Sequence, residues 1–312
     1  MKFKSIALIG IGYWGKIHLK YLRKIKKVSI NKIYFNKNKK VLKEKQLKKF
    51  NFTHKLKDIL NDRSIKFVDI VTPIKTHADL AIKFLKSGKR VLVEKPLLMS
   101  QKQEKKISKL NSNLGNLTVS YPYLFSKSLN FVQKILKEKK IGKLRYIEMN
   151  IQQCGRFMQY GVNHLLGPHA ISVLSIFYDI NKIEFKLHKV IKKNNKCETS
   201  VILCFFKNKL ISTINLSLNY TDISSKKVFV FYCDNGTVIC DLNNSKKTVI
   251  SYYYKRVIKK NYVIAKKFHL KSNFFDEKNN MRYVLESFLN KKKSLNNFKL
   301  TKKINFFLKN GK

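Results

Sequence analysis

Three glycines near the N-terminus have the spacing of a dinucleotide-binding turn. Gly10, Gly12 and Gly15 directly follow an apolar segment, Ser5 to Ile9, and precede a helical pattern. In such a turn the first glycine permits a tight bend, the second lets the backbone approach a pyrophosphate, and the third lets helix and strand pack closely. The helix N-terminus then presents N–H groups and a positive dipole end to the anion. The sequence therefore predicts that NAD or NADP binds here rather than that the glycines form an unrelated turn.

The residues that would contact the rest of the dinucleotide lie inside this turn and after the second expected strand. Tyr13 and Trp14 lie between the last two glycines, and Asn36 occupies the place where NAD-preferring enzymes carry an acid for the ribose 2′-hydroxyl. Asparagine can bond that hydroxyl but does not repel a 2′-phosphate, and Lys37 and Lys39 would attract one. NAD and NADP both remain open, and Asn36 has the alternative role of capping a turn.

Further polar residues follow the later strands. At the carboxyl ends of parallel strands, where a doubly wound sheet places its ligand crevice, we expect Thr72, Pro73, His77, Glu94 and Lys95. A lysine at a strand end is by itself more often a surface residue.

The first third of the chain has the pattern needed to position the glycine turn and these strand ends. Short β-branched segments alternate with helical patterns, which is typical of a parallel sheet with crossover helices. We expect strands at 5–9, 28–35, 67–72, 90–94 and 117–121, the third of them apolar throughout. Helices are expected at 13–25, 40–50, 76–88 and 102–110. The prediction is a doubly wound Rossmann domain over residues 1–122.

The pattern changes from about Ile147, where long alternating strands begin. The segments 199–206 and 210–218 read as one hairpin, and 228–233 and 237–242 as another around Asp234-Asn235-Gly236, whose residues tolerate a positive φ. Helices are expected at 126–136, 169–178, 281–289 and 303–308. The prediction for residues 123–312 is an α+β domain with a large open, mainly antiparallel sheet that would bind the substrate.

The order of these motifs resembles that of the Gfo/Idh/MocA oxidoreductases. The glycine turn comes first, then Thr72-Pro73 with His77 four residues after the proline, then the segment Gly88 to Leu97 containing Glu-Lys-Pro. The resemblance implies that Lys95 contacts both the nicotinamide region and the substrate hydroxyl, and that the second domain mediates homo-oligomers.

The second half resembles one subgroup, the UDP-N-acetylglucosamine 3-dehydrogenase-like members. Leu166 to Ser172 is similar to a stretch of those proteins that contains their acid/base histidine, which His169 matches. An imidazole titrates near neutral pH and can take the proton of a hydroxyl group. The alternative for His169 is a histidine that starts a helix and bonds to backbone. Their dehydrogenation of UDP-linked N-acetyl sugars belongs to surface polysaccharide synthesis. The resemblance implies hydride transfer between a sugar or nucleotide-sugar ring hydroxyl and NAD(P), with Lys95 and His169 as the working pair and Tyr121 and Arg156 near the substrate. An ordinary surface position is the alternative for Arg156.

Two positions depart from the subgroup. Leu165 and Ala170 stand where it has aspartates four residues before and directly after the histidine. Loss of the first carboxylate removes a partner for the sugar or for the histidine, and His164 is a candidate replacement. The alternative function is therefore a cofactor-binding but catalytically degenerate member with a binding or regulatory role.

The composition excludes some other classes of protein. The 67 Lys and Arg against 18 Asp and Glu give a formal charge of +49, but only seven are Arg and the lysines occur along the whole chain. This distribution favours a solvated surface over a specific nucleic-acid site. No uncharged apolar run reaches the ~18 residues that span a bilayer, so we expect a cytoplasmic protein without a membrane partner. The five scattered cysteines indicate reduced thiols, and no metal site is expected.

Overall fold

The computed structural model describes residues 4–35, 47–138, 141–154, 160–193, 196–221, 225–242, 249–259, 262–271, 279–290 and 297–310. They divide into two compact units, Met1–Tyr121 with Met281–Asn305, and Pro122–Asn280 with Phe306–Lys312. The sequence placed both terminal helices with residues 123–312, whereas Met281–Asn305 groups with the first unit. The assignment of dinucleotide binding to one domain and of substrate binding and oligomerisation to the other stays a prediction.

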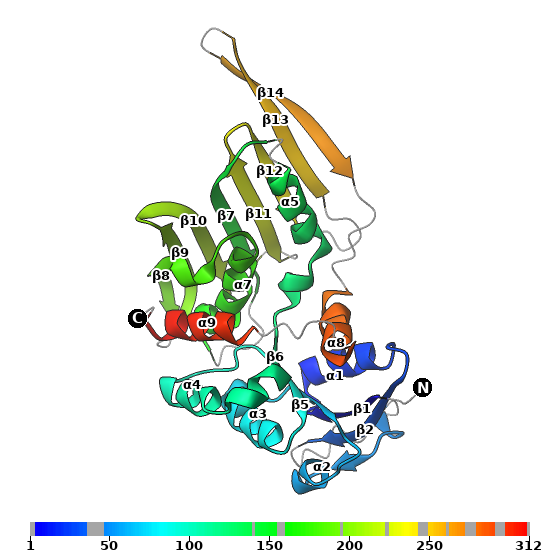
Figure 1. Cartoon of the computed structure of the whole chain (residues 1–312). Coiled ribbons are helices and arrows are strands. Elements are labelled where there is room, and N and C mark those ends of the chain that lie inside the picture. The colour runs from blue at the N-terminus through cyan, green and yellow to red at the C-terminus, as the bar shows by residue number, and fades with distance from the viewer. Residues whose placement is uncertain are drawn as a thin grey trace. The chain divides into compact units, whose positions relative to one another are not determined.

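The first unit contains a six-stranded parallel sheet (Figure 1) in the order β3-β2-β1-β4-β5-β6. Its strands are β1 Lys4–Ile9, β2 Val28–Tyr34, β3 Phe52–Thr53, β4 Phe67–Ile70, β5 Arg90–Glu94 and β6 Leu117–Ser120. The strand order reverses between β1 and β4, which is the position where doubly wound sheets bind ligands. The predicted Rossmann architecture is confirmed.

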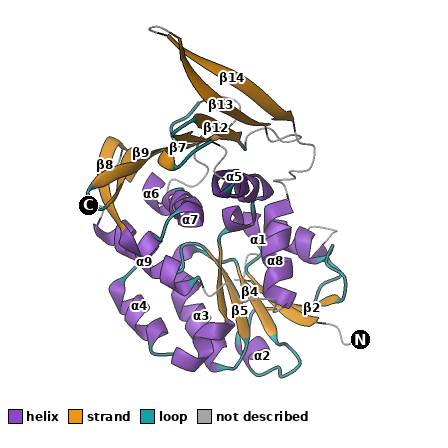
Figure 2. Cartoon of the chain, turned by 45° about the horizontal axis from the view of Figure 1, so that its top comes forward, coloured by secondary structure: helices purple, strands orange, loops and turns teal. Residues whose placement is uncertain are grey.

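Helices cover both faces of this sheet. They are α1 Tyr13–Leu22, α2 Lys57–Leu60, α3 His77–Lys86, α4 Gln101–Ser108, α8 Asn280–Asn290 and α9 Phe298–Asn310, the last of which crosses into the second unit. Helices α1 and α8 lie on one face, and α3 and α4 on the other (Figure 2). Right-handed crossovers in opposite directions from β1 and β4 produce this arrangement. Most of the helix expected at 40–50 lies outside the described residues.

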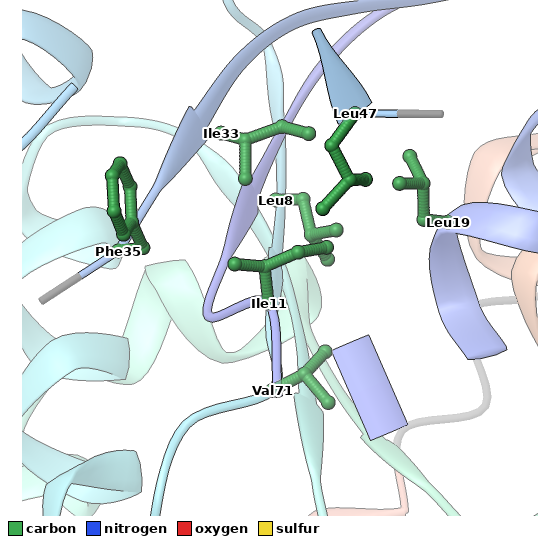
Figure 3. Close-up of a cluster of buried hydrophobic side chains, with 7 residues drawn as sticks. All are labelled: Leu8, Ile11, Leu19, Ile33, Phe35, Leu47 and Val71. Atoms are coloured by element: carbon green, nitrogen blue, oxygen red, sulfur yellow. The ribbon is translucent and has the colours of Figure 1, made fainter. Parts of the chain in front are cut away.

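A buried apolar cluster supports the glycine turn from below. Leu8 from β1, Ile11 from the turn and Leu19 from α1 converge with four other side chains (Figure 3), namely Ile33, Phe35, Leu47 and Val71. Each of the seven side chains is at most 7% exposed. Burial of this apolar surface holds α1 against β1 and β2 and thereby determines the position of the turn.

The C-terminal segment of the first unit completes its sheet edge. The Asn297 side chain accepts from the Val119 backbone N–H at 3.0 Å and donates to the Val119 carbonyl at 2.6 Å, as a neighbouring strand would. Arg90 donates to the Phe288 carbonyl at 2.8 Å, and the Phe67 and Phe288 rings pack edge to face. These contacts explain why the segment groups with the first unit.

The second unit contains an eight-stranded sheet in the order β14-β13-β12-β11-β7-β10-β9-β8. Its strands are β7 Leu144–Gln152, β8 Ile183–Lys193, β9 Lys196–Phe206, β10 Lys209–Ser217, β11 Lys226–Cys233, β12 Gly236–Asp241, β13 Val249–Lys259 and β14 Tyr262–Lys271. All neighbours are antiparallel except β7 and β10. The helices α5 Lys127–Lys137, α6 Val162–Leu165 and α7 Gly167–Phe177 lie on one face (Figure 2). The predicted large, mainly antiparallel sheet is confirmed.

Candidate functional site

Two glycines of the turn between β1 and α1 allow close approaches of the backbone. Gly10 has a φ of +100°, and a Cβ atom there would lie 2.6 Å from the carbonyl oxygen of Val71. A Cβ atom on Gly15 would lie 2.3 Å from the carbonyl oxygen of Gly10. Both distances are too short for any side chain, so the first and third glycines let the turn pack on β4 and the helix pack on the turn.

The middle glycine faces open space. A Cβ atom on Gly12 would meet nothing within 4 Å. Gly12 is the N-cap residue of α1, which has no side-chain cap and no acidic residue in its first turn. The turn therefore leaves room for an anion at the positive end of α1, and these residues fit the pyrophosphate of a dinucleotide.

The two aromatic residues of the turn are exposed. Tyr13 is 49% exposed and Trp14 is 47% exposed, and their rings form an edge-to-face pair with centroids 5.7 Å apart. Their position at the first turn of α1 is compatible with the expected contact with a dinucleotide, which stays a prediction. Asn36, Lys37 and Lys39 lie outside the described residues.

The loops after β4 and β5 are connected through His77. Its Nε2 lies 2.7 Å from the Thr72 carbonyl oxygen and its Nδ1 lies 2.9 Å from the Pro96 carbonyl oxygen, while the ring is buried. Burial lowers the pKa of His77. Thr72 also bonds Thr76 through the two hydroxyl oxygens, 2.6 Å apart, and Pro73 is the N-cap residue of the next turn. The ring nitrogens of His77 thus face backbone atoms, and its expected cofactor contact stays a prediction.

Lys95 directly follows β5 and is half-buried. Burial lowers the pKa of the Lys95 ammonium to about 8, although the Glu94 carboxylate opposes the change. The same carboxylate accepts from the Lys95 backbone N–H at 3.3 Å through Oε2. A lysine with this pKa is positioned to donate a hydrogen bond and to exchange a proton close to neutral pH.

A buried group of three ionisable side chains adjoins Lys95 through Glu94, and it was not predicted from the sequence. His18 on α1 faces Asp69 on β4, with Nδ1 to Oδ2 at 2.8 Å, and faces Glu94 on β5, with Nε2 to Oε1 at 3.2 Å. Burial alone would lower the pKa of His18, but the two carboxylates outweigh burial and raise it to about 10. The expectation that strand 67–72 is apolar throughout is wrong, because Asp69 lies in it fully buried. A single acid in an apolar strand was the available signal.

Tyr121 does not face solvent. Its side chain is 1% exposed, and its hydroxyl oxygen lies 3.1 Å from that of Thr301 on α9. Burial raises the pKa of this phenol well above its usual range. The expected place of Tyr121 near the substrate stays a prediction.

His169 lies in the first turn of α7 in the second unit, beside the buried Pro168 and Ala170. Its backbone carbonyl accepts from the Ser172 hydroxyl at 2.7 Å, and its half-buried ring packs edge to face on Tyr123 with centroids 5.1 Å apart. Leu165 is half-buried at the end of α6, and Ala170 is fully buried. Burial lowers the pKa of the neighbouring His164. Arg156 lies outside the described residues.

The comparison with known families decides the assignment of the first unit. The model of the Gfo/Idh/MocA oxidoreductase family, described as having an NAD-binding Rossmann fold, matches residues 4–121. The Rossmann domain at residues 4–121 is therefore an NAD-binding domain of this oxidoreductase type, and the match covers less than half of the chain. Its cofactor class is therefore the nicotinamide dinucleotide, and the open turn at Gly12 is where this Gfo/Idh/MocA domain would hold the pyrophosphate.

Curated relatives of this chain match at 26 to 30% identity. They include an uncharacterized oxidoreductase, YhhX, of Escherichia coli at 27% over 50% of this chain and 48% of the relative. The scyllo-inositol 2-dehydrogenase (NAD(+)) of Bacillus subtilis matches at 29% over 45% and 42%. The 4-carboxy-2-hydroxymuconate-6-semialdehyde dehydrogenase of Sphingobium matches at 27% over 75% and 78%. The first two matches span only about half of each relative.

Solved structures show the same fold over nearly the whole chain. The UDP-N-acetylglucosamine 3-dehydrogenase GnnA of Acidithiobacillus ferrooxidans has a TM-score of 0.78 at 14% identity, covering 99% of this chain and 96% of its own. GenD2 from gentamicin A biosynthesis, solved in complex with NAD, has a TM-score of 0.77 at 15% identity, covering 99% and 93%. At these identities the likeness concerns the fold alone.

The described part of the chain shows neither a metal site nor a membrane-spanning helix. Its side chains include no group of three or more His, Cys, Asp or Glu residues that could hold a metal ion. None of its helices is both long enough and apolar enough to cross a bilayer. The five cysteines, all within the described ranges, form no disulfide with one another.

Proposed function

We propose that this protein is an NAD(P)-dependent dehydrogenase that oxidises a ring hydroxyl of a sugar or nucleotide sugar. The observation that carries the proposal is Lys95, whose pKa is lowered to about 8 and which follows a strand of the NAD-binding domain. Glu94, the residue before it, contacts His18 of α1, so Lys95 lies close to the helix that starts at the glycine turn.

Different residues of the chain would bind the dinucleotide and orient the substrate. The Gly10 to Gly15 turn would hold the pyrophosphate, and the exposed Tyr13 and Trp14 rings would cover part of the dinucleotide. When bound, the nicotinamide would accept the hydride with its electron pair from the ring carbon. The Lys95 ammonium would donate a hydrogen bond to the substrate oxygen and orient it.

The proton of the oxidised hydroxyl needs an acceptor, because a ketone forms only when both the hydride and the proton leave. We assign this role to the imidazole of His169, which becomes an imidazolium as the C=O double bond forms. In the reverse direction the same imidazolium returns the proton. Arg156 is proposed to contact a substrate phosphate or carboxylate, because its guanidinium can bind two oxygens at once.

The choice of a ring hydroxyl is supported by two relatives of different origin. The Bacillus subtilis relative is named for inositol oxidation, and the structural relative from Acidithiobacillus ferrooxidans is named for oxidation of a UDP-sugar. Both substrates are hydroxylated six-membered rings. The semialdehyde dehydrogenase relative indicates that family members also act on other compounds, so the substrate must be established directly.

The direct experiment is product analysis with a panel of UDP-sugars, inositols and free hexoses, each with NAD and with NADP. We expect reduced dinucleotide and a keto product, identified by mass spectrometry, from at least one ring compound. Dinucleotide binding without turnover on any member of the panel would favour the degenerate alternative. The sequence feature behind that alternative is the absence of a carboxylate at Leu165.

A further inference from the structure

Both ring nitrogens of His18 face carboxylate oxygens, so the protonation of the ring depends on the charges of both carboxylates. Nδ1 lies 2.8 Å from Asp69 Oδ2, and Nε2 lies 3.2 Å from Glu94 Oε1. An ionised carboxylate oxygen only accepts hydrogen bonds, so each ring nitrogen must carry a proton to bond its partner when both carboxylates are ionised. His18 and Asp69 are fully buried and Glu94 is 9% exposed, so water does not replace these bonds.

The positive charge of the His18 imidazolium stabilises the folded state, because the Asp69 and Glu94 carboxylates would otherwise be buried without it. An unpaired buried charge costs several kcal/mol of folding free energy, and a buried partner of opposite sign offsets that cost. When all are ionised, Asp69 and Glu94 balance the charges of His18 and Lys95. Burial raises the pKa of Asp69, whereas the bond and the charge of His18 outweigh burial at Glu94 and lower its pKa. Glu94 is therefore the carboxylate that stays ionised.

The ionised Glu94 is directly connected to Lys95. Its second oxygen, Oε2, accepts from the Lys95 backbone N–H at 3.3 Å, and its charge opposes the effect of burial on the Lys95 ammonium. The His77 ring and the buried Tyr121 phenol are further titratable groups that interact with the charge of Glu94, and the ring nitrogens of His77 face the Thr72 and Pro96 carbonyls. Loss of the His18 charge would favour protonation of Glu94, and Lys95 would then lose its proton more readily.

We propose that His18 is a positioning residue whose imidazolium keeps Glu94 ionised and bonded to the main chain of Lys95, and thereby maintains the Lys95 ammonium. The proposal rests on the proposed function for its catalytic meaning, but the charge coupling itself concerns residues of one unit. It assigns to α1 a second role besides pyrophosphate binding. That role is to control the charge of the lysine that faces the reaction.

The test is the pH at which Lys95 becomes reactive in the full chain. Trace acetylation labels only the unprotonated amine, and mass spectrometry of the peptide containing Lys95 gives the midpoint of its titration. We expect His18→Gln and Glu94→Gln each to lower this midpoint by roughly one pH unit or more. Lys89→Met is the matched control. Lys89 comes just before β5, and the change removes its buried ammonium, which donates to the Asp62 and Ile65 carbonyls. The Lys95 midpoint should not change in this variant.

This measurement needs no substrate, so it can succeed or fail independently of the proposed activity. An unchanged Lys95 midpoint in folded His18→Gln would overturn the proposal, and so would an equal shift in Lys89→Met. If His18→Gln does not fold, NMR of the histidine-labelled wild-type protein decides. A His18 ring that stays doubly protonated above the ordinary histidine pKa of 6.5 supports the proposal, and a neutral ring there overturns it.

Discussion

The residues of the glycine turn have three different steric environments, and the sequence pattern predicts all three. Motif spacing also identified Lys95, because strand ends can be read from local pattern. His18 with Asp69 escaped prediction because their bond joins residues 51 positions apart, which no local pattern encodes. The same reason applies to Tyr121, whose hydroxyl partner Thr301 is 180 positions away.

Gly12→Val tests the turn at the residue scale. Because a Cβ atom there meets no protein atom within 4 Å, we expect the variant to fold while its side chain occupies the space for the pyrophosphate. Dinucleotide affinity should fall by about 100-fold, or about 2.7 kcal/mol. Trp14 is the single tryptophan of the chain, so energy transfer from it to NADH or NADPH measures binding. Gly115→Ala, also with open space, is the control, and equal affinity in Gly12→Val and wild type would rule the site out.

At the scale of elements, periodicity was sufficient for five strands of the first sheet and for the hairpins β9-β10 and β11-β12 of the second, but not for β3, β8, β13 and β14. It was not sufficient for the sheet edge of the first unit, because that edge is paired by one side chain. Asn297 bonds the N–H and the C=O of Val119 on β6, although the two residues are 178 positions apart. A side chain that substitutes for a strand leaves no alternation in the sequence.

Asn297→Ala should therefore destabilise the first unit. The change leaves two buried backbone groups without partners, so we expect the free energy of unfolding to fall by roughly 1–3 kcal/mol. Lys4→Ala removes an exposed hydrogen bond to Asn290 and should change it by less than about 0.5 kcal/mol. Urea unfolding of both variants compares the two effects. Equal stability losses would show that Asn297 does not hold the edge of the sheet.

At the scale of the whole molecule, the charge of +49 is distributed rather than concentrated. Dispersed lysines neutralise phosphates without reading bases, so nucleic acid should bind weakly and without sequence preference. Fluorescence anisotropy with duplexes of different sequence should give equal affinities that decrease steeply as salt increases. Tight binding of one sequence at physiological salt would contradict the interpretation of the charge as solvated surface.

Lys95 and His169 are the two residues proposed to act on the substrate hydroxyl during hydride transfer to the dinucleotide. Once a substrate is known from the panel, turnover of Lys95→Met, His169→Ala and the double variant tests this assignment most directly, with dinucleotide affinity measured through Trp14 in each. We expect each single change to lower kcat by about 10²- to 10⁴-fold while dinucleotide affinity is largely retained. In wild type, kcat/KM should also decrease as the pH rises through about 8, because the Lys95 ammonium loses its proton there. Lys95→Met should remove this decrease. Wild-type turnover in the double variant would contradict the account.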